Sequence, residues 1–111
     1  MEKRSLTALG RELLADAEAA RSGRSARTVY GGHEHMLRQT VLALTADSAL
    51  DEHDSPGEAT LIVLSGRVRL ATADTRWDGA TGDHLTIPPT RHSLTALEDS
   101  VVLLTVAKSL S

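Results

Sequence analysis

The sequence predicts an all-β domain, built as a sandwich or small barrel, with one α-helix in front of it. Several short β-rich runs separated by turn residues follow one another from Val29 to Ala107, which is typical of such folds. Residues 5–21 instead place apolar side chains at helical spacing. A chain of 111 residues is long enough for one hydrophobic core. We therefore expect a helix and linker over residues 1–30 and a barrel over residues 31–111.

Composition and charge restrict the classes of partner. Hydrophobic residues make up 41% and charged residues 24% of the chain, as in ordinary globular proteins. Phe is absent and aromatic residues make up only 2%, so that Tyr30 and Trp77 alone could stack on a base. The formal net charge of -3 gives no electrostatic reason to bind DNA. We therefore expect no nucleic-acid partner.

The chain contains no Cys, which excludes disulfides, thiolate metal sites and cysteine nucleophiles. No apolar run approaches the roughly 20 residues that a membrane span needs, and the N-terminus lacks the apolar core of a signal peptide. We expect a cytoplasmic protein with no membrane partner. The sequence also shows no serine elbow and no phosphate-binding glycine loop.

Residues 5–21 are expected to form an amphipathic helix that packs across a sheet or against a partner subunit. Ser5 is a suitable N-cap, and Ser22 with Gly23 forms a stop signal. The small and basic segment 22–28 is expected to be a flexible link. The apolar positions of the helix are Leu6, Leu9, Leu13, Leu14, Ala17 and Ala20.

The β-rich runs differ in their hydrophobic pattern. The continuous apolar run 59–64 is typical of a buried strand, while the alternation in 67–72 predicts a half-buried one. The long apolar run Val101–Val106 is expected to be exposed, and together with the apolar face of the helix it would favour a homodimer. The expected strands are 35–44, 59–64, 67–72, a return strand from residue 76 after a turn at 73–75, 85–87 and 100–107.

Two stretches with a histidine at one end are the candidates for functional chemistry. They are His53–Gly66 and Gly82–His92, and each combines a β-rich run with turn residues. Two histidines on separate strands can converge on one point inside a barrel. That is a usual geometry of a metal or small-ligand site.

The two stretches resemble the two sequence motifs of the cupins, which are small barrels built as a double-stranded β-helix. The resemblance covers about residues 31–107, and it implies a cupin barrel. Counting back from the glycine that ends the first motif places His53 on its first histidine. The matching residues are His53, Leu64, Ser65 and Gly66 in the first motif and Gly82, Asp83, Pro88 and His92 in the second.

A full cupin metal site has three histidines and one glutamate, a donor set that suits Mn, Fe, Ni or Zn. Here Ser55 stands at the second histidine and Ala59 at the glutamate, with Glu58 one residue earlier. The resemblance therefore implies a metal held by His53, His92 and, if a bulge turns it inward, Glu58. In the alternative interpretation the barrel has lost its metal and kept its fold. The two histidines would then be polar groups at the mouth of an apolar pocket.

Further polar residues are candidates for the ligand pocket. Ser55 is one of them. Arg91 could meet an anionic ligand at the mouth or be a surface loop residue, and His84 could line the pocket or lie on the exterior. His33 and His35 have a spacing that can bind a metal, but they follow a Gly-Gly turn and are expected to face solvent.

These observations lead to two functional hypotheses. The first is a small-molecule-binding cupin, acting as a sensor or binding module, with or without a divalent transition metal. The second is a metal-dependent cupin enzyme, an oxygenase or isomerase acting on a small metabolite. Because Leu and Val predominate, the barrel interior is expected to accept a small and partly apolar ligand. The expected partners are this ligand and a second copy of the chain.

Overall fold

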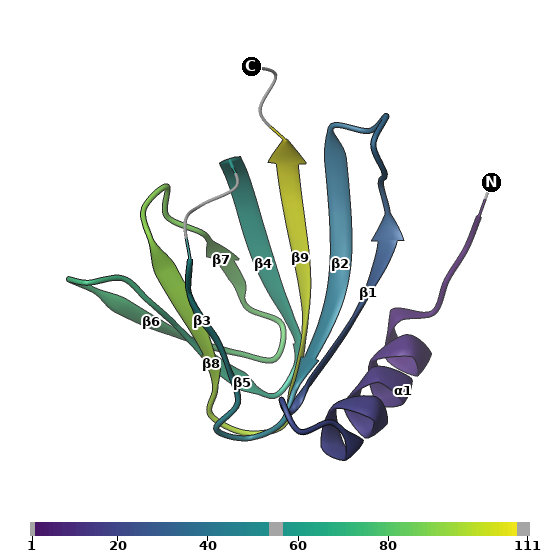
Figure 1. Ribbon diagram of the computed structural model, residues 1–111, viewed down its shortest axis with the longest axis horizontal. Helices are drawn as coiled ribbons and strands as arrows, with labels where there is room; N and C mark the ends of the chain where they lie inside the picture. The colour runs from purple at the N-terminus through teal and green to yellow at the C-terminus, as the bar shows by residue number, and fades with distance from the viewer. Residues whose placement is uncertain (1, 54–56, 109–111) are drawn as a thin grey trace.

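The computed structural model of the chain describes residues 2–53 and 57–108, with the backbone alone at 51–53 and 108. One helix precedes nine strands in the described part (Figure 1). The elements are α1 (Leu6–Ala19), β1 (Arg24–Tyr30), β2 (Leu37–Leu44), β3 (Ala49–His53), β4 (Gly57–Ser65), β5 (Arg67–Ala71), β6 (Arg76–Ala80), β7 (His84–Thr86), β8 (His92–Ala96) and β9 (Ser100–Lys108).

The strands form two antiparallel sheets. The five-stranded sheet has the order β1-β2-β9-β4-β7, and the four-stranded sheet has the order β3-β8-β5-β6. The sheets meet at the lower end in Figure 1 and diverge toward the upper end. Between them lies the main core, to which both sheets contribute alternate residues. Its buried members are Leu42, Leu44, Ala59, Leu61, Val63, Val68, Leu70, Ile87, Leu94, Ala96, Val102 and Val106. The sequence prediction of an all-β fold with an N-terminal helix is confirmed.

Helix α1 lies against the outer face of the five-stranded sheet, over β1, β2 and β9 (Figure 1). Ser5 caps it by accepting a hydrogen bond from the Ala8 amide at 3.1 Å. Gly10 lets the helix come close to β9, because a Cβ there would lie 3.1 Å from Cγ1 of Val101. A second core results. Its buried members are Leu9, Leu13 and Ala17 of the helix and Val41, Ala43 and Val101 of the sheet.

The expectation that Val101–Val106 is exposed is wrong. These residues belong to β9, which lies between β2 and β4 and has a core on each face. Val101 is 4% exposed and Val102 fully buried. A continuous apolar run is the pattern of a strand covered on both faces, since both of its alternating faces need apolar side chains. The structural premise of a homodimer through this run is therefore absent.

Strand β1 occupies the segment that the sequence suggested as a flexible link. Its residues pair with β2 from Arg24 opposite Leu44 to Tyr30 opposite Gln39, with a bulge after Thr28. The strand was missed because it is an edge strand with an exposed or half-exposed surface, and so lacks an apolar alternation. The Arg24 guanidinium donates to the Ala49 carbonyl at 2.8 Å, which links this edge to β3 of the other sheet.

The end of the barrel where the sheets meet is closed by hydrogen bonds around Ser100. This side chain is fully buried, and its hydroxyl oxygen accepts from the Arg67 amide at 3.0 Å. Gly66, at a φ of 95°, passes directly over Ser100 and the Asp99 carbonyl. The Asp99 carboxylate accepts from the Ala46 amide at 2.8 Å. No helix in the described residues is long and apolar enough to span a membrane.

Candidate functional site

A small pocket lies between the two sheets, and its described lining contains a single polar side chain. Its volume is about 50 Å³. His92 is the polar member, and the other side chains are aliphatic. The lining residues are Leu42, Leu50, Ala59, Leu61, Leu70, Ile87, His92, Leu94 and Leu104.

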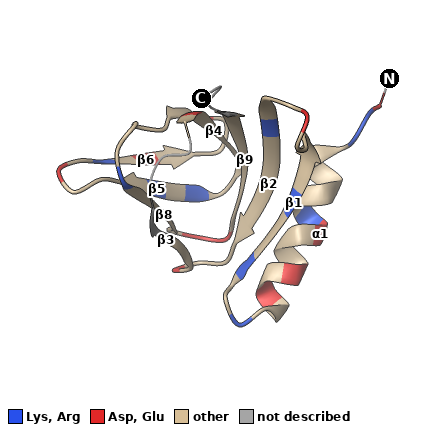
Figure 2. Ribbon diagram, turned by 45° about the horizontal axis from the view of Figure 1, so that its top comes forward, with Lys and Arg blue, Asp and Glu red and all other residues tan. Residues whose placement is uncertain are grey.

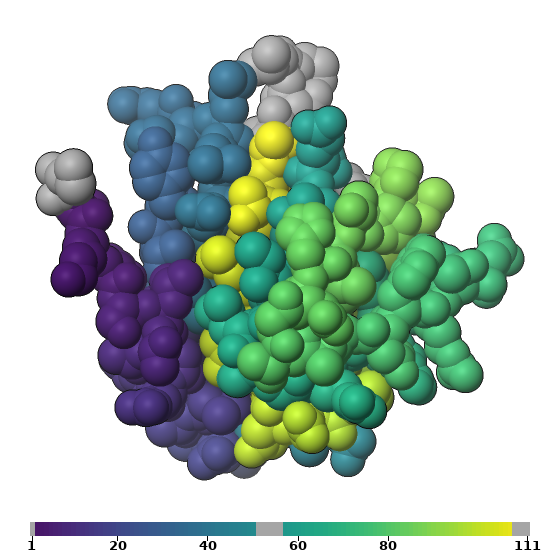
Figure 3. Space-filling model, turned by 180° about the vertical axis from the view of Figure 1, so that it is seen from behind, coloured from purple at the N-terminus to yellow at the C-terminus, as the bar shows by residue number. Residues whose placement is uncertain are grey.

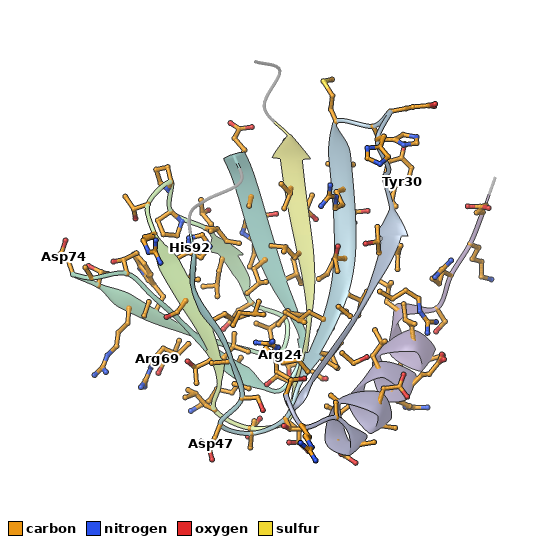
Figure 4. All side chains as sticks on the ribbon, viewed as in Figure 1. Arg24, Tyr30, Asp47, Arg69, Asp74 and His92 are labelled. Carbon is orange, nitrogen blue, oxygen red and sulfur yellow. The ribbon has the colours of Figure 1, made fainter. Side chains whose placement is uncertain are left out.

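His92 begins β8 and is 3% exposed (Figure 4). Its Nδ1 lies 2.8 Å from the Thr90 carbonyl oxygen. Because a carbonyl oxygen can only accept, Nδ1 carries the proton of this hydrogen bond. Residues 94 and 96 of the same strand are also buried, in step with the pleat. The strand and the hydrogen bond therefore fix the imidazole at the wall of the pocket.

The sheet register brings residue 53 next to residue 92. Strand β3 pairs with β8, with His53 opposite His92 in the ladder after an irregularity beyond Leu50. The two strands that carry the cupin-like histidines are thus neighbours in the four-stranded sheet. The side chain of His53 lies outside the described residues, as does the whole of Ser55.

Glu58 does not face the interior. It is exposed, while its neighbour Ala59 is 7% exposed and lines the pocket. The only irregularity in the pairing of β4 with β9 lies between Val63 and Ser65, so no bulge turns Glu58 inward. A strand without such a bulge alternates its faces, and residues 58 and 59 must point to opposite sides.

The described donors do not fit a cupin metal site. Among the residues of known side-chain position, no three His, Cys, Asp or Glu side chains gather within reach of one metal ion. Among the described side chains, His92 is the only one of these types that lines the interior pocket. A transition metal needs several imidazole or carboxylate ligands, whereas the described part of this wall offers aliphatic groups around one imidazole.

A wider groove of about 620 Å³ lies beside the pocket, along the ends of β4 and β7. It shares Ala59 and Ile87 with the interior pocket, so these two side chains separate the groove from the interior. The groove is lined by Gly57, Glu58, Ala59, Thr60, Thr86, Ile87 and Pro89. Glu58 therefore lies outside the barrel wall, at an approach to it.

The other sequence candidates lie on the surface. Arg91 precedes the buried His92 and is exposed, and His84 is exposed on the edge strand β7. His33 and His35 are exposed in the connection between β1 and β2. The His35 ring packs edge-on against the Tyr30 ring, with 5.1 Å between centroids. The structure thus brings His92 to the interior pocket, and it does not bring Glu58, Arg91 or His84 there.

Solved structures share this two-sheet arrangement. A conserved protein of unknown function from Streptococcus pyogenes is 27% identical, with a TM-score of 0.73 over 83% of this chain and 80% of that one. A cupin superfamily protein from Desulfitobacterium hafniense is 13% identical, with a TM-score of 0.71 over 78% of each chain. The chain adopts the cupin fold. A cupin 2 conserved barrel domain protein from Salinispora arenicola is matched over 98% of this chain and 90% of that one, at 18% identity and a TM-score of 0.70.

No protein-family model matches the sequence, and no curated protein matches it either. The similarities to solved structures therefore establish the cupin architecture of this chain. What its interior binds has to be inferred from the residues that line it.

Proposed function

We propose that this chain is a small-molecule-binding cupin whose interior takes a small, mainly apolar ligand with one polar group. The observation that carries the proposal is the pocket between the sheets, where aliphatic side chains surround the buried imidazole of His92. Ligand sites in proteins commonly combine apolar walls with a few fixed polar groups that orient the ligand.

The size and polarity of the pocket restrict the ligand. A volume of about 50 Å³ exceeds what one water molecule needs, but it admits only a few non-hydrogen atoms unless side chains move. An apolar wall does not hold water firmly. An apolar ligand group that enters the pocket therefore contributes about 25 cal/mol of binding free energy for each Å² of its surface that is buried. A short branched alcohol has the required combination of apolar bulk and one hydroxyl.

The polar group of the ligand is expected to lie beside His92. The hydrogen bond from Nδ1 to the Thr90 carbonyl holds the ring in one orientation before any ligand arrives. A fixed ring loses little rotational freedom on binding, which favours recognition of a hydroxyl or a similar group. Neither the apolar contacts of the ligand nor its hydrogen bond to His92 requires a metal ion.

A titration followed by methyl NMR tests the proposal. The probes are isobutanol, benzene and glycerol, which differ in apolar bulk and in the number of hydroxyls. Saturable shifts of the Leu42, Leu61 and Leu94 methyls are expected with isobutanol and benzene and not with glycerol. Ala59→Leu fills the pocket and should weaken binding at least about tenfold. Absence of a saturable shift with every probe would refute the proposal.

A matched variant separates pocket filling from general effects on the strand. Thr60 is the next residue of β4 and belongs to the outer groove but not to the pocket lining. Thr60→Leu adds the same side chain to the opposite face of the strand. It should leave isobutanol binding unchanged, and equal losses in the two variants would contradict an interior site.

The alternative is a metal-dependent cupin enzyme, and the ladder position of His53 opposite His92 is the observation in its favour. Metal analysis of the protein purified without a histidine tag distinguishes the two. Near-stoichiometric metal that His53→Ala removes and His33→Ala retains would support the enzyme hypothesis. Absence of metal, together with isobutanol binding, would support the metal-free binding protein.

A further inference from the structure

Strand β6 is an uncovered edge of the four-stranded sheet. It pairs with β5 on one side, and no described strand lies on its other side. The hairpin that it forms with β5 projects from the body of the molecule, with Asp74 at its tip (Figures 3 and 4). An accessible edge strand can pair with a strand of another chain, because it presents unpaired backbone amides and carbonyls.

The hydrogen bonds of the hairpin show which backbone groups face outward. The Thr72 amide donates to the Thr75 carbonyl at 2.8 Å, so these residues form a hydrogen-bonded pair next to the turn. Bonded and non-bonded pairs alternate along an antiparallel ladder. Trp77 therefore bonds to β5, while the amides and carbonyls of Arg76 and Asp78 point to the open edge. The outward-facing Ala80 amide agrees with this alternation, since it donates to the Asp83 carboxylate at 2.8 Å.

The side chains of β6 differ between its two faces. Trp77, opposite Leu70 in the ladder, is 43% exposed on the face that looks toward the barrel interior. Arg76 and Asp78 lie on the other face, where β5 carries further basic residues (Figure 2). Asp78 accepts from the Arg69 guanidinium at 2.8 and 3.1 Å. Arg76 forms no ion pair with any residue of the described chain.

We propose that two copies of this chain associate by pairing their β6 strands antiparallel about a two-fold axis at Trp77. In this register Arg76 of each copy lies opposite Asp78 of the other, and the two Trp77 residues face each other. The outward backbone groups of Arg76 and Asp78 then form the hydrogen-bonded pairs, as the ladder pattern requires. Opposite charges and aromatic pairs are both favourable in directly opposed positions.

Charge selects this register over its neighbours. Moving the axis to residue 76 would oppose the two Arg76 guanidinium groups, and moving it to residue 78 would oppose the two Asp78 carboxylates. Both arrangements are unfavourable, because like charges directly opposite each other destabilise a strand pair. Only the axis at Trp77 makes both ion pairs at once. The contact is then the same on both copies and closes as a dimer.

The two edge strands of the five-stranded sheet, β1 and β7, lack this self-complementarity. Strand β1 carries Arg24 and Arg27 and no carboxylate, so a second β1 strand would offer no opposite charge to pair with them. Strand β7, at the far edge, has three residues. The β6 edge therefore fits a second copy of the chain better than either of these.

Two charge variants test the proposal, with sedimentation equilibrium from about 1 μM to about 1 mM, a range suited to a small interface. Arg76→Glu places a new carboxylate opposite Asp78 of the other copy, and Asp78→Lys places a new ammonium group opposite Arg76. Each variant alone should self-associate at least about tenfold more weakly than the wild type. An equimolar mixture of the two should associate again, since every opposed pair then has opposite charges.

Trp77 supplies an independent readout, because it is the only tryptophan of the chain. Its fluorescence emission should shift to shorter wavelength as the wild type associates. Arg67→Glu is the matched control. It makes the same charge change on β5, away from the edge, and should leave association unchanged.

Three results would overturn the proposal. They are a wild type that stays monomeric at the highest concentration, equal weakening by Arg67→Glu and Arg76→Glu, and a mixture of the two charge variants that associates no better than either alone. If Asp78→Lys does not fold, Trp77→Thr replaces it. That variant should weaken association without changing any charge, and unchanged association would also overturn the proposal.

Discussion

Replacing Gly66 by Ala should destabilise the protein far more than the same change at Gly82. Both glycines have positive φ, 95° at Gly66 and 90° at Gly82. An L-residue is strained in either position, at a cost of about 1–2 kcal/mol. The backbone strain is therefore nearly the same at the two sites, and the surroundings make the difference.

The surroundings differ completely. A Cβ on Gly66 would overlap the Ser100 hydroxyl and the Asp99 carbonyl, whereas a Cβ on Gly82 would have no described heavy atom within 4 Å. Ser100 is fully buried and holds the Arg67 amide, so it cannot move without breaking that hydrogen bond. Leaving a buried amide unpaired costs about 1–3 kcal/mol.

Adding the two costs gives a loss of about 2–5 kcal/mol for Gly66→Ala, against about 1–2 kcal/mol for Gly82→Ala. Urea unfolding followed by circular dichroism measures both free energies. The larger loss is a substantial part of the total stability of an ordinary domain. Equal losses in the two variants would refute the argument that Gly66 is required by the closed end of the barrel.

Three further predictions concern the two cores, the pocket and the surface. Leu13→Ala should lower the free energy of unfolding by about 3 kcal/mol, since the side chain is 1% exposed beneath α1; a loss below about 1 kcal/mol in urea unfolding would contradict a packed helix. His92→Leu should weaken isobutanol binding about tenfold, which is the equivalent of one hydrogen bond. Benzene binding should stay unchanged in the same NMR titration. Equal effects on the two ligands would show that the imidazole does not recognise the hydroxyl. The hydrogen bond from Arg69 lowers the pKa of Asp78, so this pair stabilises the fold above the unfolded pKa and ceases to do so as pH falls through the folded pKa. Asp78→Asn should therefore be slightly less stable than the wild type at pH 7, with a gap that closes below about pH 4, as thermal melts across pH would show.

The sequence predicted the elements whose pattern is set by burial. Leu6–Ala19 has one apolar face and became a helix, and the apolar runs at 59–64 and 100–107 became β4 and β9. The continuous apolar run at 100–107 also indicated that this strand lies inside the sheet rather than at its edge. A strand with neighbours on both sides and a core on each face needs apolar residues throughout, and this describes β9 better than an exposed edge does.

Other elements had weaker signals. Strand β8 was missed, because its alternation of buried His92, Leu94 and Ala96 with half-buried residues begins at a polar residue. Gly79 is a residue type that weakens a strand, yet it lies within β6. There a Cβ would be 3.0 Å from Leu85, so the missing side chain serves packing rather than a bend.

The candidate site was predictable in part. The spacing of the cupin-like motifs indicated His92, and the structure places it at the pocket. The orientation of Glu58 depended on whether β4 bulges at that point, which one sequence does not determine. The aliphatic wall opposite His92 comes from several strands, and only the sheet register brings those strands together.

The position of β9 has a consequence for the order in which this fold can be completed during synthesis. Residues 100–108 follow all the other described strands, yet they lie between β2 and β4 and contribute to both cores. Until a ribosome has released them, β2 and β4 lack the neighbour that joins them, and α1 lacks part of the surface on which it rests. The apolar faces of the earlier strands therefore stay uncovered until β9 pairs with β2 and β4, a long-range pairing that completes both cores.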